Sequence, residues 1–304
     1  MFCKQCGNEI KEGVRFCTSC GNETYVLKIN PVKKWKVFFI AKRKKIILAI
    51  SVFVVLIIIL MIGLYFPKKK PTTDQQQENI ASTVVNIYCE GVAGWNDDSS
   101  VSGGSGTIIT TDGLVLTNAH IIPQGKNAST DKDSCLVILP DPTTGSSKEM
   151  YYAEPYVVSD ISEKYDLAFM QINDVYYDAE EGKAYGEYPK KFPAYDSDIY
   201  CKNENVKLGE PVRIYGYPAI SGGFALTITD GIVSSLLIDE GYIITSAKIS
   251  HGNSGGLAVD KNGCRIGIPS MVSSDESESL GVIISNNLIS DFTEEVQAYI
   301  EVNK

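Results

Sequence analysis

Histidine is scarce in this chain of 304 residues, which contains only His120 and His251. A mechanism that needs an imidazole base therefore has two candidates. Residues 1–70 have few acidic side chains, 3 Asp and Glu against 14 Lys and Arg, whereas residues 71–304 have 34 against 14. The acidic excess argues against nucleic acid as a partner of the second part, and the asymmetry indicates that the two parts face different surroundings.

Charged residues are absent from residues 46–66, which are apolar and have no polar stripe. A helix of this length spans a hydrocarbon core of about 30 Å, so the segment is predicted to be a transmembrane helix. The 45 residues before it and the lack of a small-residue cleavage site after it favour a signal anchor over a cleaved signal peptide. Seven basic residues between positions 33 and 45 precede it and three follow at 68–70, which predicts a single-pass cell-membrane protein with a cytoplasmic N-terminus and an extracytoplasmic acidic part.

Two Cys-x-x-Cys-Gly units lie near the N-terminus, with ten residues between Cys6 and Cys17. Each unit can place two thiolates on one side of a tetrahedral metal, so Cys3, Cys6, Cys17 and Cys20 are predicted to hold a zinc ion. Two disulfides are the alternative, but they need an oxidising compartment, and the predicted orientation places this segment in the cytoplasm. Four sulfur ligands leave no open position, so the zinc is expected to be structural, and an unidentified cytoplasmic partner would bind the ribbon.

The other four cysteines are scattered through the acidic part, and their spacing fits no metal motif. They are Cys89, Cys135, Cys201 and Cys264. One or two disulfides are expected, and the sequence leaves all three complete pairings open.

Five segments follow from these features. They are a zinc ribbon, a basic juxtamembrane segment, a transmembrane helix, a flexible polar linker and a β-rich domain, at residues 1–25, 26–45, 46–66, 67–79 and 80–304. Short β-branched runs separated by turn residues fill the last segment and predict a barrel or a sandwich. Its end, residues 288–302, is predicted to be a helix that begins near Ser290 or Asp291 and turns Phe292, Val296 and Tyr299 to one face.

The segment Gly-Asn-Ser-Gly-Gly at residues 252–256 has the composition of a nucleophile loop. A serine hydroxyl needs a base to accept its proton and donors for the developing oxyanion. Glycines permit a kinked backbone that can aim the N–H groups of Gly252 and Ser254 into one pocket. An ordinary turn would have the same composition, so the motif alone does not decide.

His120 ends a predicted hairpin, and Asp166 precedes an apolar strand. A surface histidine and a turn aspartate are the structural alternatives. Together with Ser254 they follow the chain order of the chymotrypsin-type triad, in which the carboxylate fixes the tautomer of the imidazole. His251 lies three residues before Ser254 on the same short loop and is expected at the rim of the substrate cleft instead.

Several longer motifs occur in a family's order, namely GSGTII, DGLVLTNAH, YDLAFMQI, VRIYGYP, TDGIVSS, GNSGG and LGVIISNNLI. Over about residues 80–300 the sequence resembles the trypsin-fold serine proteases, in particular the Deg/HtrA type. The resemblance implies a mainly β fold, a double six-stranded antiparallel β-barrel with a C-terminal helix. It also implies His120 as general base, Asp166 as its orienting partner and Ser254 as nucleophile. Gly252 and Ser254 would form the oxyanion hole, with no cofactor for catalysis.

The sequence departs from this family in three places. No PDZ domain is expected after the last helix, His251 stands where the family often has proline, and residues 171–197 are expected to form an enlarged surface loop. Lys248 occupies the position of the acid that attracts Arg or Lys in trypsin, so an apolar or small P1 residue is expected. The residues predicted to line its pocket are Ile249, His251, Val282, Ile283 and Ile284.

The sequence thus predicts a membrane-anchored serine endopeptidase. It would cleave extracytoplasmic proteins or peptides through an acyl-enzyme intermediate, in protein quality control. The alternative is a protease-like sensor that signals to a cytoplasmic partner of the zinc ribbon without essential catalysis. A homo-oligomer is left open.

Overall fold

The computed structural model describes nine stretches of the chain, residues 2–11, 16–22, 73–90, 101–123, 134–159, 165–197, 201, 206–272 and 280–302. The chain divides into two compact units, Met1–Lys69 and Lys70–Lys304. The predicted juxtamembrane segment and transmembrane helix, residues 26–45 and 46–66, lie outside the described residues. Among the helices that are described, none has the length and apolar character needed to cross a membrane.

The first unit contains two loops with the same backbone pattern. In each loop the first cysteine N–H donates to an asparagine carbonyl five residues later, and a glycine N–H donates back to the cysteine carbonyl. These bonds join Cys3 to Asn8, Gly7 to Cys3, Cys17 to Asn22 and Gly21 to Cys17, at 2.8 to 2.9 Å. Gly7 and Gly21 have φ angles of 79° and 75°, so each loop needs glycine where the chain turns back.

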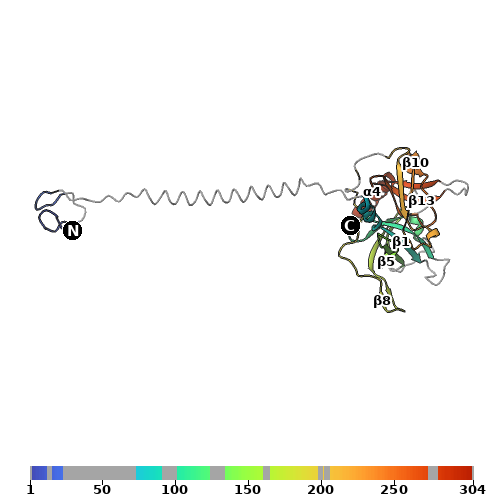
Figure 1. Ribbon diagram of the computed structural model, residues 1–304, viewed down its shortest axis with the longest axis horizontal. Helices are drawn as coiled ribbons and strands as arrows, with labels where there is room; N and C mark the ends of the chain where they lie inside the picture. Colours follow the sequence, from blue (N-terminus) through green and yellow to red (C-terminus); the bar gives the residue numbers. More distant parts are fainter. Residues whose placement is uncertain are drawn as a thin grey trace. The chain divides into compact units, whose positions relative to one another are not determined.

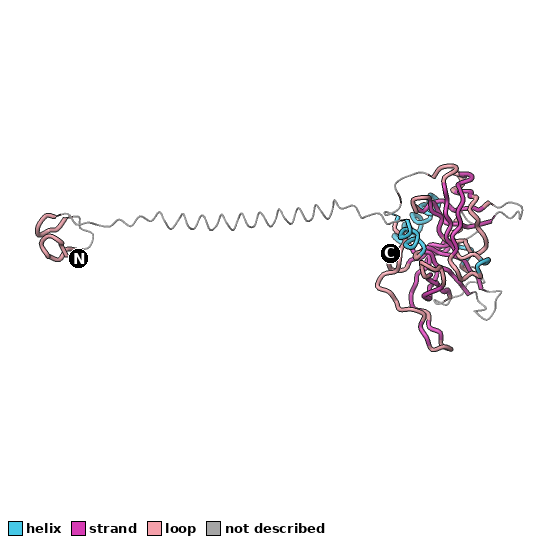
Figure 2. Tube along the Cα trace, viewed as in Figure 1, coloured by secondary structure: helices cyan, strands magenta, loops and turns pink. Residues whose placement is uncertain are grey.

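The second unit is built from two closed antiparallel barrels (Figures 1 and 2). The first has the strand order β1 (Val84–Glu90), β2 (Val101–Ile108), β3 (Leu114–Thr117), β6 (Ala168–Val175), β5 (Ser147–Val158) and β4 (Cys135–Pro140). The second has the order β10 (Thr227–Leu237), β11 (Tyr242–Thr245), β14 (Gly281–Ser285), β13 (Arg265–Val272), β12 (Leu257–Asp260) and β9 (Pro211–Gly216). Alternating burial fills each barrel with its own apolar cluster. The predicted double six-stranded barrel is confirmed, and the sandwich alternative is wrong.

The polar stretch before the barrels is partly helical, which corrects the prediction of a flexible linker over residues 67–79. Helix α2 spans Thr73–Ala81. Its last turn buries Ile80 and Ala81, at 2% and 3% exposure, in a cluster with tyrosines of the second barrel. The apolar anchor lies at the end of the helix, so the polar residues before it show no amphipathic period. Composition alone therefore indicated a linker.

The C-terminal helix α4, Asn286–Val302, begins earlier than expected. Leu288 and Ile289 are buried ahead of the predicted start, and they hold the first turn against the barrel. Phe292 stacks on Phe169 with ring centroids 5.3 Å apart, as expected for the packed face. Tyr299 follows Phe292 by seven residues on the same face but is 71% exposed, so the packing of this face against the barrel ends before Tyr299.

Residues 171–197, expected as an enlarged loop, contain a projecting two-stranded hairpin. Strands β7 (Tyr177–Asp178) and β8 (Lys183–Ala184) form it, and Figure 1 shows it standing away from the barrels. The chain then returns to the barrels, where Phe192 is buried in the first barrel and Tyr195 in the cluster that contains Ile80 and tyrosines of the second. The segment is therefore a projecting hairpin followed by residues that are packed against the barrels.

Two disulfides resolve the pairing that the sequence left open. Cys89 bonds Cys135 across the register pair of β1 and β4, and Cys201 bonds Cys264. A disulfide stabilises a domain mainly by restricting its unfolded chain.

Replacing Cys89 and Cys135 together with alanine is expected to lower the free energy of unfolding by about 2 to 5 kcal/mol. The reason is that the bridge closes a loop of 46 residues in the unfolded chain. Chemical denaturation followed by near-ultraviolet circular dichroism measures the change. Serine substitution of Cys6, which forms no disulfide, is the control and should leave the barrel transition in place. An unchanged midpoint in the double variant would contradict the expectation.

Candidate active site

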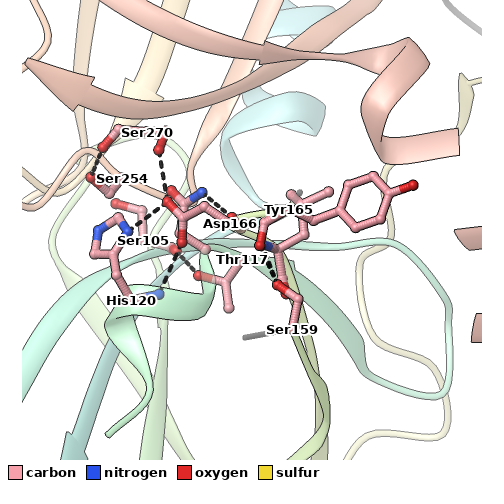
Figure 3. A network of polar contacts seen from close by, with 10 residues as sticks. Ser105, Thr117, His120, Ser159, Tyr165, Asp166, Ser254 and Ser270 are labelled. Atoms are coloured by element: carbon pink, nitrogen blue, oxygen red, sulfur yellow. Dashed lines mark hydrogen bonds and ion pairs between the residues drawn. The ribbon is translucent and has the colours of Figure 1, made fainter. Parts of the chain in front are cut away.

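His120 and Asp166 meet at the end of the first barrel. His120 lies in the short helix η2 (Ala119–Ile121), directly after β3 and Asn118. Its Nδ1 lies 2.7 Å from Oδ2 of Asp166, and its backbone N–H donates to Oδ1 at 3.0 Å. The side-chain amide of Asn118 donates to the backbone carbonyl of Asp166 at 2.7 Å, which fixes the two segments together. The carboxylate thus holds one ring nitrogen and leaves the other to face a reactant (Figure 3).

Ser270, on β13 of the second barrel, also belongs to this network. Its hydroxyl donates to Oδ2 of Asp166 at 2.8 Å, and its side chain is only 3% exposed. The Asp166 carboxylate therefore accepts three hydrogen bonds, two from His120 and one from Ser270. Sequence reasoning missed Ser270, and its one signal is that it is the polar residue in the apolar run Ile-Pro-Ser-Met-Val.

Ser254 lies in the same network, as Figure 3 shows. Its hydroxyl donates to the carbonyl oxygen of Ser270 at 2.6 Å, and the contacts described for it include none with the His120 ring. The structure therefore brings all three predicted catalytic side chains into one region, with the serine hydroxyl turned toward Ser270.

The loop around Ser254 depends on glycine. Gly252 has φ 94°, and a Cβ there would lie 2.3 Å from the carbonyl oxygen of Tyr217. Gly255 has φ 80°, and its N–H donates to the carbonyl of Pro269 at 2.9 Å. Within the part of the chain that the structure describes, the N–H groups of Gly252 and Ser254 donate to no acceptor. Both donors are therefore available to a ligand.

Ser105 of the first barrel is hydrogen-bonded to this loop. Its hydroxyl donates to the carbonyl of Gly252 at 2.6 Å and accepts from the N–H of Tyr217 at 2.9 Å. Its own N–H donates to the carbonyl of Ser254 at 2.8 Å. Since Ser105 is fully buried, these bonds are shielded from water and strengthen the attachment of the loop. The sequence showed Ser105 only as part of a Gly-Ser-Gly run.

The predicted pocket residues fall into two groups. His251 is exposed and Val282 is half-buried, so both offer surface to a ligand. Ile249 is 6% exposed and packs on Gly281, where a Cβ would lie 2.5 Å from its Cδ1. Ile283 and Ile284 are buried in two different core clusters, so neither presents surface to a substrate here. The strand period explains this, because β14 is covered by core residues on both of its faces.

The four N-terminal cysteines form a second candidate site. Their sulfur atoms lie within 4.8 Å of one another, with Cys3 to Cys20 at 3.6 Å and Cys6 to Cys17 at 3.7 Å. A tetrahedral ion with bonds to sulfur of about 2.3 Å needs sulfur atoms about 3.8 Å apart, so the group fits a metal. Backbone N–H groups of Gln5 and Cys6 lower the pKa of Cys3 to about 6, which favours the thiolate that metals bind.

Known protein families match both units of the chain. The profile of the trypsin-like peptidase domain matches residues 104–268. The chain belongs to the trypsin-like peptidase family. The zinc-ribbon domain profile matches residues 2–24 of this trypsin-like peptidase, which supports a structural metal site there.

Individual relatives of this trypsin-like peptidase are of the HtrA and DegP type. Serine protease HTRA1B of Danio rerio is 30% identical over 203 residues, which cover 63% of this chain and 35% of that protein. A probable periplasmic DegP-like serine endoprotease of Brucella suis is 31% identical over 188 residues, 60% of this chain and 30% of that one. The chain thus spans about a third of these relatives.

A solved structure of the serine endoprotease from Yersinia pestis superposes on the chain with a TM-score of 0.53 and 25% identity. The match covers 74% of this chain and 66% of that one. Together these likenesses confirm the prediction of a serine endopeptidase domain.

Proposed function

We propose that the chain is a membrane-anchored serine endopeptidase that cleaves extracytoplasmic proteins through His120, Asp166 and Ser254. The observation that carries the proposal is the 2.7 Å contact of His120 Nδ1 with Asp166, in the same network as Ser254. A carboxylate in this position orients the imidazole and stabilises the imidazolium that forms during the reaction. His251 has no such carboxylate contact among the described residues.

The proposed reaction follows from this geometry. The hydroxyl of Ser254 rotates from the Ser270 carbonyl toward His120, which accepts its proton as the oxygen attacks the scissile carbonyl. The N–H groups of Gly252 and Ser254 bind the oxyanion. His120 then gives the proton to the leaving amine, and water hydrolyses the acyl-enzyme by the same route.

Zinc is the proposed metal of the ribbon, because four thiolates in a tetrahedron suit it. The ion would hold the two loops of the ribbon together and take no part in hydrolysis. A cytoplasmic protein is the proposed partner of the ribbon, and assembly of the chain into a homo-oligomer is compatible with this proposal.

The proposed topology is supported by the state of the cysteines. The second unit contains two disulfides, whereas the four cysteines of the first unit are unbridged and grouped for a metal. Disulfides form in oxidising compartments, and thiolate zinc sites are typical of reducing ones. A membrane between the units, crossed by residues 46–66, would place each in a suitable compartment. The name of the Brucella relative, a periplasmic endoprotease, agrees with this assignment.

Protein quality control is the proposed role. Lys248 occupies the position at which trypsin has an acid that attracts Arg or Lys. The expected P1 side chain is therefore apolar or small. Apolar side chains are mostly buried in folded proteins, so such a preference confines cleavage to unfolded chains. Cleavage of a randomised peptide library checks this, and a dominant Arg or Lys at P1 would contradict it.

A fluorophosphonate probe tests the catalytic site directly. We expect it to label Ser254 of the full chain and to leave the Ser254→Ala variant unlabelled, with mass spectrometry locating the adduct. Because the reaction needs an activated serine, a folded protein that stays unlabelled would contradict the peptidase proposal. The non-catalytic sensor, which transmits binding to a partner of the ribbon, would then be favoured.

A further inference from the structure

Two apolar side chains stand exposed on one loop next to the catalytic residues. The loop comprises residues 218–226 and connects β9 to β10 through the short helix η4 (Ala219–Ser221). Ile220 is 80% exposed and Phe224 is 57% exposed. Large apolar side chains that are exposed together often mark a binding site, because burying them against a ligand is favourable.

The 218–226 loop is held in place at several points. Its Gly223 carbonyl accepts hydrogen bonds from the side chains of Asn86 and Tyr88 on β1. Phe224 stacks on the ring of Tyr88 with centroids 5.7 Å apart, and its carbonyl accepts from Ser147 at 3.1 Å. The two exposed side chains therefore sit on a fixed base, so a ligand would meet an ordered surface at a small entropic cost.

The same loop contacts the nucleophile loop. The N–H of Ala219 donates to the carbonyl of His251 at 2.8 Å. Gly252 lies so close that a Cβ would be 3.3 Å from the Cα of Pro218. Ile220 directly follows Ala219, which is hydrogen-bonded to the loop that carries the proposed oxyanion donors.

The position of Tyr88 shows which half of a substrate would reach this surface. Tyr88 pairs with Gly103, the residue before Gly104, across β1 and β2. A Cβ on Gly104 would lie 2.5 Å from Ile121, the residue after His120, and 3.2 Å from the Ser254 carbonyl. The surface therefore extends from the His120 side of the nucleophile. His120 delivers its proton to the leaving amine, so the leaving half of the substrate lies on this side.

We propose that Ile220, Phe224 and Tyr88 form an apolar subsite for a side chain on the leaving-group half of the substrate. The proposal rests on the catalytic site proposed above. The chemistry that fits is an aliphatic or aromatic residue within the first few positions after the scissile bond. The subsite gives the peptidase a second apolar requirement, in addition to the one at P1.

Acyl transfer isolates this half of the substrate. The full chain is acylated at Ser254 by a short ester that has no leaving-group residues, and amides of amino acids and of dipeptides then compete with water. The amine attacks the acyl carbon, the new amide bond forms, and the bond to Ser254 Oγ breaks as the oxygen regains its proton through His120. The ratio of amide product to hydrolysed acid therefore reports on the amine alone.

We expect leucinamide to be preferred over glycinamide, or glycyl-leucinamide over glycyl-glycinamide, by roughly tenfold in the wild type, the range for one apolar side chain in a pocket. Ile220→Ser and Phe224→Ser should each lower this preference severalfold, and Ile220→Leu should keep it. Ile220→Ser leaves no core cavity because the side chain is mostly exposed. The matched control is Ile238→Ser, an isoleucine that is 73% exposed on the β10–β11 turn, and its preference should equal that of the wild type.

Two results would overturn the subsite, and they can be told apart. An acyl-enzyme that forms normally, with the same amine preference in wild type, Ile220→Ser and Phe224→Ser, rejects the subsite and leaves the peptidase proposal intact. The exposed pair would then belong to a contact with another protein. A full chain that forms no acyl-enzyme rejects the catalytic proposal, and the subsite with it.

Discussion

Replacing His120 with alanine is expected to lower kcat/KM for peptide cleavage by at least about 10⁴-fold. In the proposed mechanism the imidazole removes the proton from Ser254 and returns it to the leaving amine, and the structure pairs it with Asp166 at 2.7 Å. Without it the serine keeps its proton at neutral pH, and only binding and oxyanion stabilisation remain. Steady-state kinetics on a quenched fluorescent peptide measures the loss.

His251→Ala is the matched control, because it removes the other imidazole of the chain. His251 is exposed at the rim of the nucleophile loop, and only its backbone carbonyl has a described contact there. Its replacement should change kcat/KM by less than about tenfold, mainly through KM, since a rim contact contributes to binding. Equal losses in two folded variants would show that the base has been misassigned.

Removing the metal from the N-terminal ribbon is expected to unfold residues 2–22. The buried apolar cluster of this unit comprises only Cys3, Ile10 and Cys17 among the described residues, which is too small to stabilise a fold. In small zinc domains the metal contributes on the order of 10 kcal/mol or more, so folding and metal binding are one event. A strong chelator should therefore make the ribbon sensitive to added protease, as followed by mass spectrometry, and zinc should reverse this.

Two substitutions in the second cysteine loop of the ribbon provide the control for this experiment. Cys20→Ser removes one proposed ligand and should reproduce the effect of the chelator, whereas Ser19→Ala, on an exposed neighbour, should not. Ester hydrolysis by the second unit should survive in all cases, because the proposed catalytic residues all belong to that unit. A ribbon that stays resistant to protease after complete metal removal would contradict the expectation.

The sequence predicted well where the chemistry is local. The glycines around Ser254 and the repeated Cys-x-x-Cys-Gly units each act within a few residues, and the turns they indicate are present. The pairing of His120 with Asp166 spans 46 residues, yet the chain order of the motifs and the family resemblance indicated it. The double barrel followed from the same resemblance, whereas the strand pattern alone left a sandwich open.

Contacts that depend on packing between distant segments could not be predicted. Ser270 reaches Asp166 across 104 residues, and Ser105 reaches Gly252 across 147, with no local motif to mark either serine. The start of α4 and the helix α2 were missed for a related reason. Their positions are set by apolar side chains that find partners only in the folded barrels, so propensity and period do not reveal them.

The division of the proposed catalytic residues between two barrels determines when the growing chain could first cleave protein. His120 and Asp166 belong to the first barrel, and Ser254 to the second. A ribosome makes about 5 to 20 residues per second, so the first barrel is synthesised seconds before the nucleophile exists. In the folded protein, Ser105 of the first barrel also holds the loop that carries Ser254, through hydrogen bonds to Gly252 and Ser254. A chain that ends before Ser254 lacks the proposed nucleophile, so the proposed activity cannot begin before Ser254 has been synthesised.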